Sequence, residues 1–399
     1  MYNILPAVIG LGYVGLPMFL RLNKKFRTIG FDIDFNRVQT LKNKLDINLE
    51  FKKSDLFLKN NSLITNKKNS LKQCNFYIIT VPTPIYRDNK PDLRPLNSAC
   101  EIISKNINDN DIIFIESTVY PGLTEILKKK FFKKKKIWMG YSPERINPGD
   151  RKHTLKNITK IVSFESCPKE IKKKILFIYK KISKNIIISN SIQNAEMSKV
   201  IENIQRDINI AFMNEILMVC EKLNLNFQEV IKLAKTKWNF LNFSPGLVGG
   251  HCLPVDPFYL YDVAQRKGHE AKFMLAGRRV NNELEFFLQN KIIKKIKKNK
   301  IKKLLICGIS YKANVADARN SLGLNILKSL RKTNIDVEAF DPILNKNSQK
   351  KHNIKSKIRN LSKYDLIVVL VKHDIFLKIF KKNKLRNPKK YFDLFDTLS

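Results

Sequence analysis

Three glycines near the N-terminus constrain the fold of this chain most strongly. Gly10, Gly12 and Gly15 follow a short apolar run at residues 4–9 and open a helical stretch, in the spacing G-x-G-x-x-G. The first glycine permits a tight turn, the second lets a pyrophosphate approach the backbone, and the third lets the helix pack against the strand. Asp32 ends the next strand, where a carboxylate accepts a hydrogen bond from a ribose 2′-hydroxyl and disfavours NADP. The pattern predicts a βαβ unit that binds NAD, with a purely structural glycine turn as the alternative.

The same alternation of short apolar runs and helical stretches occurs at both ends of the chain and predicts parallel sheets. Pro6 lies inside the first run, and because proline cannot donate to a sheet ladder we expect it at the start of that strand. The predicted strands are residues 4–9, 28–31, 76–81, 112–115, 137–140, 304–308, 336–340, 365–371 and 391–395, with a helix at 321–332.

Between these two α/β regions, residues 191–234 have the pattern of a long amphipathic helix. Apolar residues recur at steps of three and four, which predicts one continuous apolar face. Such a face also suits contact with a partner subunit. Glu196, Lys199, Asn203 and Arg206 fall on the opposite face, and the pattern alone favours solvent exposure for them.

The net charge of +40, from 75 Lys+Arg against 35 Asp+Glu, raises the possibility of an acidic partner such as nucleic acid. The basic residues are mainly lysines spread along the chain together with Asn, Ile and Phe. That distribution favours a solvated surface, and no interleaving of arginines with aromatic residues indicates base stacking. We therefore expect no specific nucleic-acid partner.

Cysteine usage and hydropathy indicate a soluble cytoplasmic chain. The six cysteines are scattered without a paired CxxC spacing, so we expect free thiols and no metal site. No apolar run approaches the roughly 20 residues that a membrane span requires, so no membrane association is expected.

One of these cysteines lies in an unusual setting. Gly249, Gly250 and His251 immediately precede Cys252, and Asp256 follows four residues later. Glycines next to a cysteine let a substrate approach the thiol and leave backbone amides free to hold an oxyanion. A buried structural cysteine is the alternative, and His251 alone would be weak support for catalysis.

Three further turns each follow a predicted strand. They contain Thr83 in Val-Pro-Thr-Pro, Thr118 in Glu-Ser-Thr-Val-Tyr-Pro-Gly, and Glu144 beside Arg145 in Ser-Pro-Glu-Arg-Ile-Asn-Pro-Gly-Asp. Ligands of open α/β sheets bind beyond the carboxyl ends of the strands, so these turns are expected to border one cleft. Ordinary turns and a surface ion pair are the alternatives.

Taken in order, these segments resemble the UDP-glucose/GDP-mannose dehydrogenase family over essentially the whole chain. Within it, the chain is most similar to the branch that acts on UDP-N-acetylglucosamine or UDP-N-acetylgalactosamine in Vi-antigen and O-antigen sugar pathways. UDP-glucose and UDP-N-acetylmannosamine are the alternative substrates. The branch-like segments are residues 116–122, 141–150, 200–203, 205–207, 236–241, 245–252 and 276–279.

The resemblance implies a two-step, NAD-dependent oxidation at C6 of the sugar, through a thiohemiacetal and a thioester on Cys252, with hydrolysis to the uronate. The residues implied to be catalytic are Cys252, Lys199, Asn203, Asp256, Glu144 and Thr118. The residues expected to bind NAD are Gly10, Gly12, Tyr13, Val14, Gly15, Asp32, Arg37, Thr83 and Thr118. The residues expected to bind the UDP-sugar are Glu144, Arg145, Lys199, Asn203, Gly249, Gly250, Tyr259, Lys312 and Arg319.

The resemblance also implies an α/β fold with two Rossmann-like doubly wound domains joined by a helical central dimerisation domain. We expect the NAD-binding domain at residues 1–190, the helical domain with the cysteine loop at 191–300, and the UDP-sugar-binding domain at 301–399. A homodimer or higher homo-oligomer is implied. Ser244, Ala313 and Ala316 depart from the family pattern. The competing hypotheses are a drifted, inactive relative and a basic protein whose +40 charge engages nucleic acid.

Overall fold

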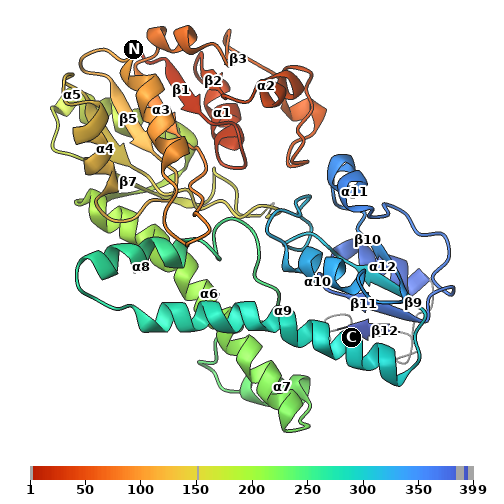
Figure 1. The fold of residues 1–399 in the computed structure, drawn as a ribbon. Coiled ribbons are helices and arrows are strands. Elements are labelled where there is room, and N and C mark those ends of the chain that lie inside the picture. The colour runs from red at the N-terminus through yellow and green to blue at the C-terminus, as the bar shows by residue number, and fades with distance from the viewer. Residues whose placement is uncertain (1–2, 151, 383–390, 394–399) are drawn as a thin grey trace. The chain divides into compact units, whose positions relative to one another are not determined.

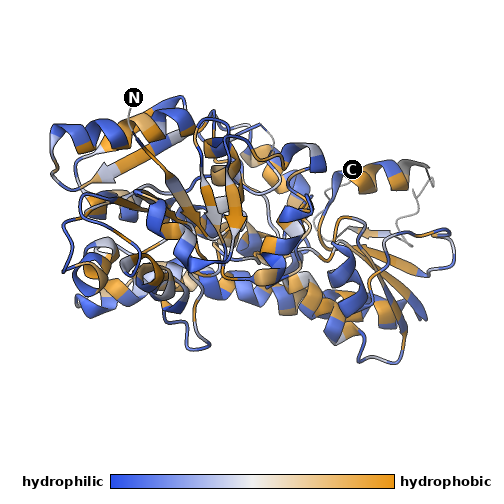
Figure 2. Cartoon of the chain, turned by 90° about the horizontal axis from the view of Figure 1, so that it is seen from above, coloured by the Kyte–Doolittle hydropathy of each residue, from blue (hydrophilic) through white to orange (hydrophobic). Residues whose placement is uncertain are grey.

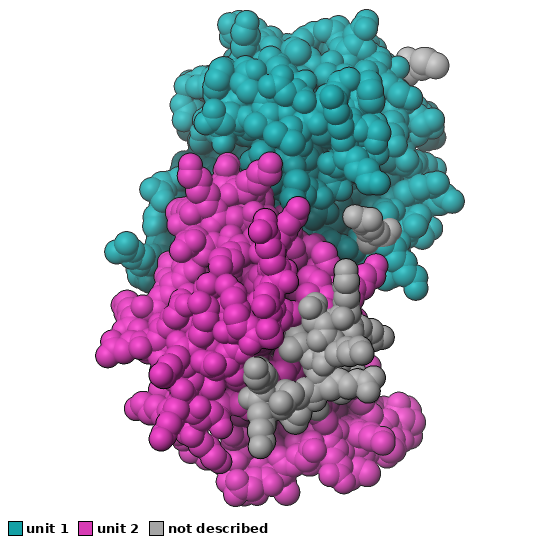
Figure 3. Space-filling model, turned by 90° about the vertical axis from the view of Figure 1, so that its right-hand side faces the viewer, with its two compact units in different colours: residues 1–202, 258–270 teal, residues 203–257, 271–399 magenta. Residues whose placement is uncertain are grey.

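The computed structural model describes residues 3–150, 152–382 and 391–393 and divides into two compact units. Unit 1 comprises Met1–Glu202 and Phe258–Glu270, and unit 2 comprises Asn203–Pro257 and Ala271–Ser399 (Figure 3). The predicted helical segment 191–300 contributes residues to both units, and the three-domain boundaries stay a prediction.

Unit 1 is built on one eight-stranded sheet (Figure 1). Its strands are β1 (Pro6–Ile9), β2 (Ile29–Phe31), β3 (Leu63–Thr65), β4 (Phe76–Ile79), β5 (Ile112–Ile115), β6 (Trp138–Tyr141), β7 (Thr159–Phe164) and β8 (Asn185–Ser189). Their order is β3-β2-β1-β4-β5-β6-β7-β8, and all neighbours are parallel except β6 and β7. The order reverses between β1 and β4, which is where doubly wound sheets bind their ligands.

Helices cover this sheet because its central strands are apolar on both faces. Phe76 and Ile78 of β4 lie in the apolar cluster that also holds the first and fifth helices. Tyr77 and Ile79 alternate with them and are equally buried, so they face the other side of the sheet. The helices of this region are α1 (Gly15–Asn23), α2 (Phe35–Lys42), η1 (Lys53–Asp55), η2 (Lys68–Gln73), α3 (Arg94–Ser104), α4 (Leu123–Phe131), α5 (Lys169–Ile182) and α8 (Asp256–Arg266).

Unit 2 contains a second, four-stranded sheet. Its strands are β9 (Lys303–Cys307), β10 (Asp336–Phe340), β11 (Leu366–Val369) and β12 (Tyr391–Asp393). They are all parallel, in the order β10-β9-β11-β12. Its helices are α7 (Phe227–Ala234), α9 (Lys272–Lys298), α10 (Leu322–Leu330), α11 (Lys346–His352) and α12 (Asp374–Lys382). Leu284, Leu288 and Ile292 of α9 join the core over β9, and the parallel sheets with flanking helices confirm the predicted α/β class.

The predicted strands are confirmed to within a few residues at each end. Pro6 is the first residue of β1, as expected for a residue that has no backbone N–H to donate to the sheet. The end of the predicted strand 391–395 lies outside the described residues. In Figure 2 the strands of both sheets are mainly orange, whereas the helices carry blue and orange bands. None of the described helices is long and apolar enough to cross a membrane.

Helix α6 (Ile192–Lys222) runs from unit 1 into unit 2, and the expectation about its polar face is wrong in part. Glu196 and Asn203 are buried and Lys199 is half-buried; only Arg206 is exposed. Glu196 is buried because its carboxylate accepts hydrogen bonds from the amides of Gly122 and Thr124 at the start of α4.

The apolar face of α6 is instead partly open to solvent. Ile201, Phe212 and Val219 are exposed, Phe212 to 53%, and so is Leu223 directly after the helix. The helix therefore directs part of its polar face inward and part of its apolar face outward.

Candidate active site

The glycine turn after β1 has the geometry that a dinucleotide requires. Gly10 has a φ of +91°, which a residue with a Cβ rarely adopts. A Cβ at Gly15 would lie 1.8 Å from the carbonyl oxygen of Gly10, so helix α1 can approach the strand only with glycine there. A Cβ at Gly12 would meet no atom within 4 Å. The turn is therefore closely packed at Gly10 and Gly15 and open at Gly12, where a pyrophosphate would fit. Tyr13 and Val14 are half-buried beside it.

Asp32 lies next to this turn. Its Oδ2 accepts a hydrogen bond from the amide of Leu11 at 2.7 Å, and its Oδ1 accepts one from the amide of Asp34 at 2.9 Å. Each carboxylate oxygen can accept a further bond, so the group fits a ribose hydroxyl.

Arg37 has a different setting from that of a simple cofactor contact. It is buried, its Nε donates to the Leu11 carbonyl at 2.8 Å, and its Nη1 pairs with Asp46 at 2.9 Å. Its Nη2 has no hydrogen-bond partner among the described residues. Arg37 thus stabilises the glycine turn through its hydrogen bond to the Leu11 carbonyl. Its contact with NAD stays a prediction.

The turns with Thr83, Thr118 and Glu144 follow β4, β5 and β6, which are parallel neighbours. Their strand ends therefore meet at one edge of the sheet. Thr83 and Thr118 are half-buried there. Tyr259 of α8 is buried against the same edge, and its hydroxyl donates to the Pro84 carbonyl at 3.2 Å.

Glu144 is held from both sides of its carboxylate. Oε1 accepts hydrogen bonds from the amides of Arg145 and Ile146, each at 2.6 Å, and Oε2 lies 3.3 Å from Nζ of Lys160. Arg145 in turn donates to the Thr159 carbonyl at 3.1 Å. Lys160 was not predicted from sequence, although a lone lysine within an apolar strand is the signal that could have indicated it.

A second group of predicted residues lies in unit 2, around Cys252. The amides of Val255 and Asp256 both donate to the Cys252 carbonyl, at 2.9 and 2.8 Å, so the chain folds back on the cysteine. Asn203 Nδ2 donates to Asp256 Oδ2 at 2.5 Å, and both side chains are buried. This contact joins α6 to the cysteine loop. Lys199 lies one helical turn earlier on α6, in unit 1.

Exposure separates Cys252 from the other cysteines. Its residue is exposed, whereas Cys74, Cys100, Cys220 and Cys307 are buried and Cys167 is half-buried. Burial raises the pKa of the thiols of Cys74 and Cys100 to about 12. Those buried thiols form the reactive thiolate only at high pH.

The glycines before Cys252 pack onto the loop after β9, also in unit 2. Gly250 donates through its amide to the Asn320 carbonyl at 3.3 Å, and a Cβ at Gly249 would lie 2.5 Å from that oxygen. A Cβ at Gly250, whose φ is +92°, would lie 2.7 Å from the Tyr311 ring. Lys312 is half-buried in the same loop. Glycines are therefore required here for close approach.

An ion pair secures this contact. His251 Nε2 lies 3.5 Å from Asp317 Oδ2, and Arg319 binds the Asp317 carboxylate through Nε and Nη2, at 3.0 and 2.6 Å. Burial alone would raise the pKa of Asp317, but the hydrogen bonds from His251 and Arg319 outweigh it and hold the pKa below its usual range. Asp317 was not predicted to be a site residue. Its position two residues before Arg319, which is expected to bind the UDP-sugar, could have indicated it.

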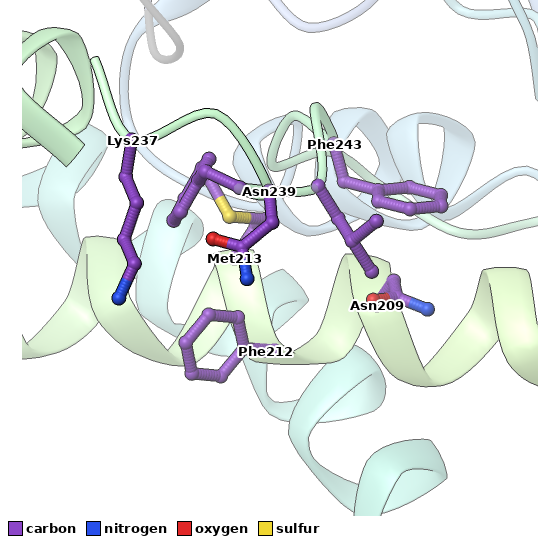
Figure 4. A pocket seen from close by; sticks show the side chains of 8 residues that line it. Asn209, Phe212, Met213, Lys237, Asn239 and Phe243 are labelled. Atoms are coloured by element: carbon purple, nitrogen blue, oxygen red, sulfur yellow. The ribbon is translucent and has the colours of Figure 1, made fainter. Parts of the chain in front are cut away.

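A pocket of about 250 Å³ lies elsewhere in unit 2 (Figure 4). It is lined by Asn209, Phe212 and Met213 of α6 and by residues of the segment 237–243. None of the predicted site residues lines it. Within the described ranges, no group of three or more His, Cys, Asp or Glu residues could hold a metal ion.

Three domains of one family match the chain in order. The NAD binding domain of the UDP-glucose/GDP-mannose dehydrogenase family matches residues 5–183, its central domain matches 193–283, and its UDP binding domain matches 305–399.

Individual relatives agree with this match. A UDP-N-acetyl-D-glucosamine 6-dehydrogenase of Salmonella typhi is 41% identical over 385 residues, covering 93% of this chain and 90% of its own length. Protein CapL of Staphylococcus aureus is 40% identical over 403 residues, covering 97% and 92%. The solved structure of a UDP-D-ManNAc dehydrogenase from Pyrococcus horikoshii superposes with a TM-score of 0.83 at 25% identity, covering 98% of this chain and 94% of that one.

Proposed function

The chain belongs to the UDP-glucose/GDP-mannose dehydrogenase family, and from that membership we propose that it oxidises a UDP-N-acetylhexosamine to the uronic acid. It is an NAD-dependent UDP-sugar dehydrogenase. UDP-N-acetylglucosamine is the leading substrate, because the Salmonella typhi relative, which is 41% identical, is named for it. Its galactose epimer comes next. UDP-glucose and UDP-N-acetylmannosamine are the alternative substrates, the latter supported by the name of the Pyrococcus horikoshii structure.

The exposed Cys252 in its glycine-rich loop is the observation that carries the proposed mechanism. Two molecules of NAD in succession would supply the hydride acceptors, the first for oxidation of the C6 hydroxymethyl group to the aldehyde and the second for oxidation of the adduct on Cys252. The turn of Gly10, Gly12 and Gly15 with Asp32 would hold each of them. The Cys252 thiolate adds to the C6 aldehyde to form a thiohemiacetal, and oxidation of that adduct leaves a thioester. A covalent thioester divides one difficult conversion into two easier ones.

We assign the proton steps to polar residues of the two units. Asn203 and Asp256 share a buried hydrogen bond at the base of the cysteine loop. We assign Asn203, together with Lys199, to stabilising the oxyanion of the adduct. We assign Asp256, Glu144 and Thr118 to handling the proton and the water that hydrolyses the thioester.

The loop after β9 supports recognition of the nucleotide end. Arg319 is a cation on the rim of the cysteine loop, and Lys312 lies seven residues before it. Arginine and lysine side chains bind phosphate oxygens well. We assign these two residues to the diphosphate. We assign Gly249 and Gly250 to the sugar, because they bring backbone close to Cys252.

The proposed assembly is a homodimer that buries the exposed apolar face of α6. Ile201, Phe212 and Val219, with Leu223 directly after the helix, supply a surface that costs free energy when it faces water. The proposed compartment is the cytoplasm, where a thiol such as that of Cys252 stays reduced.

The test is turnover with a panel of UDP-sugars. Purified protein is mixed with NAD and each sugar, and the NADH formed per sugar consumed is measured, with Cys252→Ser in parallel. The proposal expects two NADH per UDP-N-acetylhexosamine and no uronate in the variant. Turnover of UDP-glucose or UDP-N-acetylmannosamine alone would reject the substrate and keep the mechanism. Folded protein that binds NAD without turning over any sugar would favour an inactive relative.

A further inference from the structure

Two of the branch-like segments, residues 205–207 and 276–279, hold none of the predicted site residues. Both contribute to a polar contact between α6 and α9, which cross in unit 2 (Figure 1). Arg278 Nη1 donates to Asp207 Oδ1 at 2.5 Å, and the two side chains are 3% and 0% exposed. The two segments thus meet as an ion pair in the interior of unit 2.

The stability of the helix pair does not account for this ion pair. Further along the same two helices, Leu217, Leu284 and Leu288 pack in one apolar core. Replacing a buried ion pair by apolar side chains of similar volume often leaves stability unchanged or raises it, because both ions lose their water on burial. Arg278 Nε and Asp207 Oδ2 also have no hydrogen-bond partner among the described residues. An apolar contact at this crossing would therefore cost less than the polar one.

A chain of side-chain amides leads from the ion pair to the cysteine loop, which spans residues 246–256. Asn281 Nδ2 donates to the backbone carbonyl and to Oδ1 of Asp207, at 3.0 and 2.8 Å. Asn281 Oδ1 accepts a hydrogen bond from Asn214 Nδ2 at 2.8 Å. Asn214 holds both backbone groups of Gly246, because its Oδ1 accepts from the amide at 2.8 Å and its Nδ2 donates to the carbonyl at 3.1 Å. Asp207, Asn214 and Asn281 are all 0% exposed.

Each amide of this chain has one orientation that satisfies its neighbours. The Asp207 carbonyl can only accept, so Asn281 turns its NH2 group toward it and its oxygen toward Asn214. The Gly246 N–H can only donate, so Asn214 presents its oxygen there and its NH2 group to Asn281. The orientation of Asn214 at the loop is therefore set at the crossing of α6 and α9.

Helix α6 thereby holds the cysteine loop on both sides of Cys252. Asn214 binds Gly246, six residues before the cysteine, and Asn203 binds Asp256, four residues after it. Asn203 and Asn214 are eleven residues apart, close to three helical turns, so they lie on one face of α6. Along the helix this separation is about 16 Å, whereas the ten residues from Gly246 to Asp256 would span about 33 Å when extended. The loop is therefore bent between two anchors on one helix.

We propose that Asn214 is a positioning residue for Cys252, held in its orientation by Asn281 and Asp207. The inference rests on the proposed function only for the use of Cys252 as the nucleophile. Attack requires the reacting atoms to lie about 3–3.5 Å apart, and a misplacement of about 1 Å can reduce the rate by about 100-fold. Anchors at both ends of the loop limit such a misplacement.

The experiment measures amide hydrogen–deuterium exchange in the full-length protein without substrate, resolved to single residues by mass spectrometry. The Gly246 amide reports the contact itself. The amides of Gly250, Val255 and Asp256 report the rest of the loop, because backbone carbonyls accept their hydrogen bonds. In Asn214→Ala we expect all four amides to exchange about fivefold faster. A merely structural role would change the Gly246 amide alone.

A second variant keeps the test decisive if Asn214→Ala does not fold. Asn281→Leu removes the group that orients Asn214 and leaves the loop itself unchanged, so we expect the same four amides to exchange about twofold faster. Cys220→Ala is the matched control, because Cys220 is buried on α6 in the apolar core and makes no part of the amide chain. It is expected to leave the exchange of the loop as in wild type.

Three results would overturn the inference. The first is faster exchange in Asn214→Ala that is confined to the Gly246 amide. The second is wild-type exchange of the loop in Asn281→Leu, and the third is equal acceleration of the loop in Cys220→Ala.

Kinetics separate this inference from the proposed function. Asn214→Ala should lower kcat by at least about tenfold and leave the KM for NAD unchanged, because the predicted NAD-binding residues belong to unit 1. If Cys252→Ser turns over a UDP-sugar at the wild-type rate, the proposed role of Cys252 fails, and the exchange experiment still decides whether Asn214 positions the loop. If Cys252→Ser is inactive and Asn214→Ala keeps the wild-type kcat, the inference fails and the role of Cys252 stands.

Discussion

Two neighbouring glycines of the first turn should respond to alanine in opposite ways. A Cβ at Gly15 would lie 1.8 Å from the Gly10 carbonyl oxygen and 2.4 Å from Thr80 Oγ1. An ordinary carbon–oxygen contact needs about 3.3 Å, so α1 would have to move by about 1.5 Å. Because the nearest obstacle is backbone and cannot rotate away, we expect Gly15→Ala to destabilise unit 1 by about 3 kcal/mol, at the upper end for overpacking.

Gly12→Ala is the matched control, since a Cβ there meets no atom within 4 Å. We expect its stability to remain within about 0.5–1 kcal/mol of wild type. Its methyl group would occupy the space proposed for the pyrophosphate. Saturating NAD, at about 100 times its Kd, should stabilise the wild type by about 2.7 kcal/mol and leave Gly12→Ala unmoved.

Urea unfolding, followed by tryptophan fluorescence, measures both effects. Trp138 lies in β6 of unit 1 and Trp238 lies in unit 2, so a Trp238→Phe background makes Trp138 the reporter for unit 1. With a slope of about 3 kcal/mol per M, Gly15→Ala should lower the midpoint by about 1 M. An unchanged midpoint in Gly15→Ala, or NAD stabilisation of Gly12→Ala equal to that of wild type, would refute this account of the turn.

Further predictions concern unit 2. Asn203→Ala removes an amide that donates to the buried Asp256 carboxylate, so the free energy of unfolding, measured with urea, should fall by about 1–3 kcal/mol; an equal midpoint would contradict the contact. Asp317 has a folded pKa below its unfolded value, so its stabilising contribution is present above about pH 4 and is lost as pH falls further. The melting temperature of Asp317→Asn should therefore change less than that of wild type between pH 5 and about pH 3, and parallel acid profiles would reject this. Cys252 should be the thiol alkylated first by iodoacetamide in native protein, as mass spectrometry of peptides can check. Phe212→Lys, on the exposed face of α6, should lower the sedimenting mass toward that of a monomer, whereas an unchanged mass would place the interface elsewhere.

Local sequence patterns were sufficient for much of the fold. The glycine spacing at residues 10–15, apolar runs such as residues 112–115 and the proline at the start of β1 all act over a few neighbouring residues. The strands named from the sequence were therefore placed to within a few residues, whereas β3, β7 and β8 were not predicted. The cysteine loop was singled out by its own composition, but its glycines pack against the loop after β9, and its role toward a substrate stays a prediction.

Long-range pairing was beyond such patterns. Helical periodicity assigned Glu196 and Asn203 to a polar face and favoured water around them, yet both are buried. Their partners, the start of α4 and Asp256, lie 72 and 53 residues away in the sequence. Periodicity reports which side chains share a face, and it does not report what covers that face.

The sequence by itself determined the family, the α/β class and most strands of the two largely parallel sheets, because short-range backbone geometry and motif spacing depend on neighbouring residues. Only the tertiary structure decided which charges meet. Lys160 reaches Glu116, 44 residues away, and His251 reaches Asp317 of another loop. A buried charge is tolerated only beside its counter-charge, and that pairing depends on how distant strands and loops come together in space.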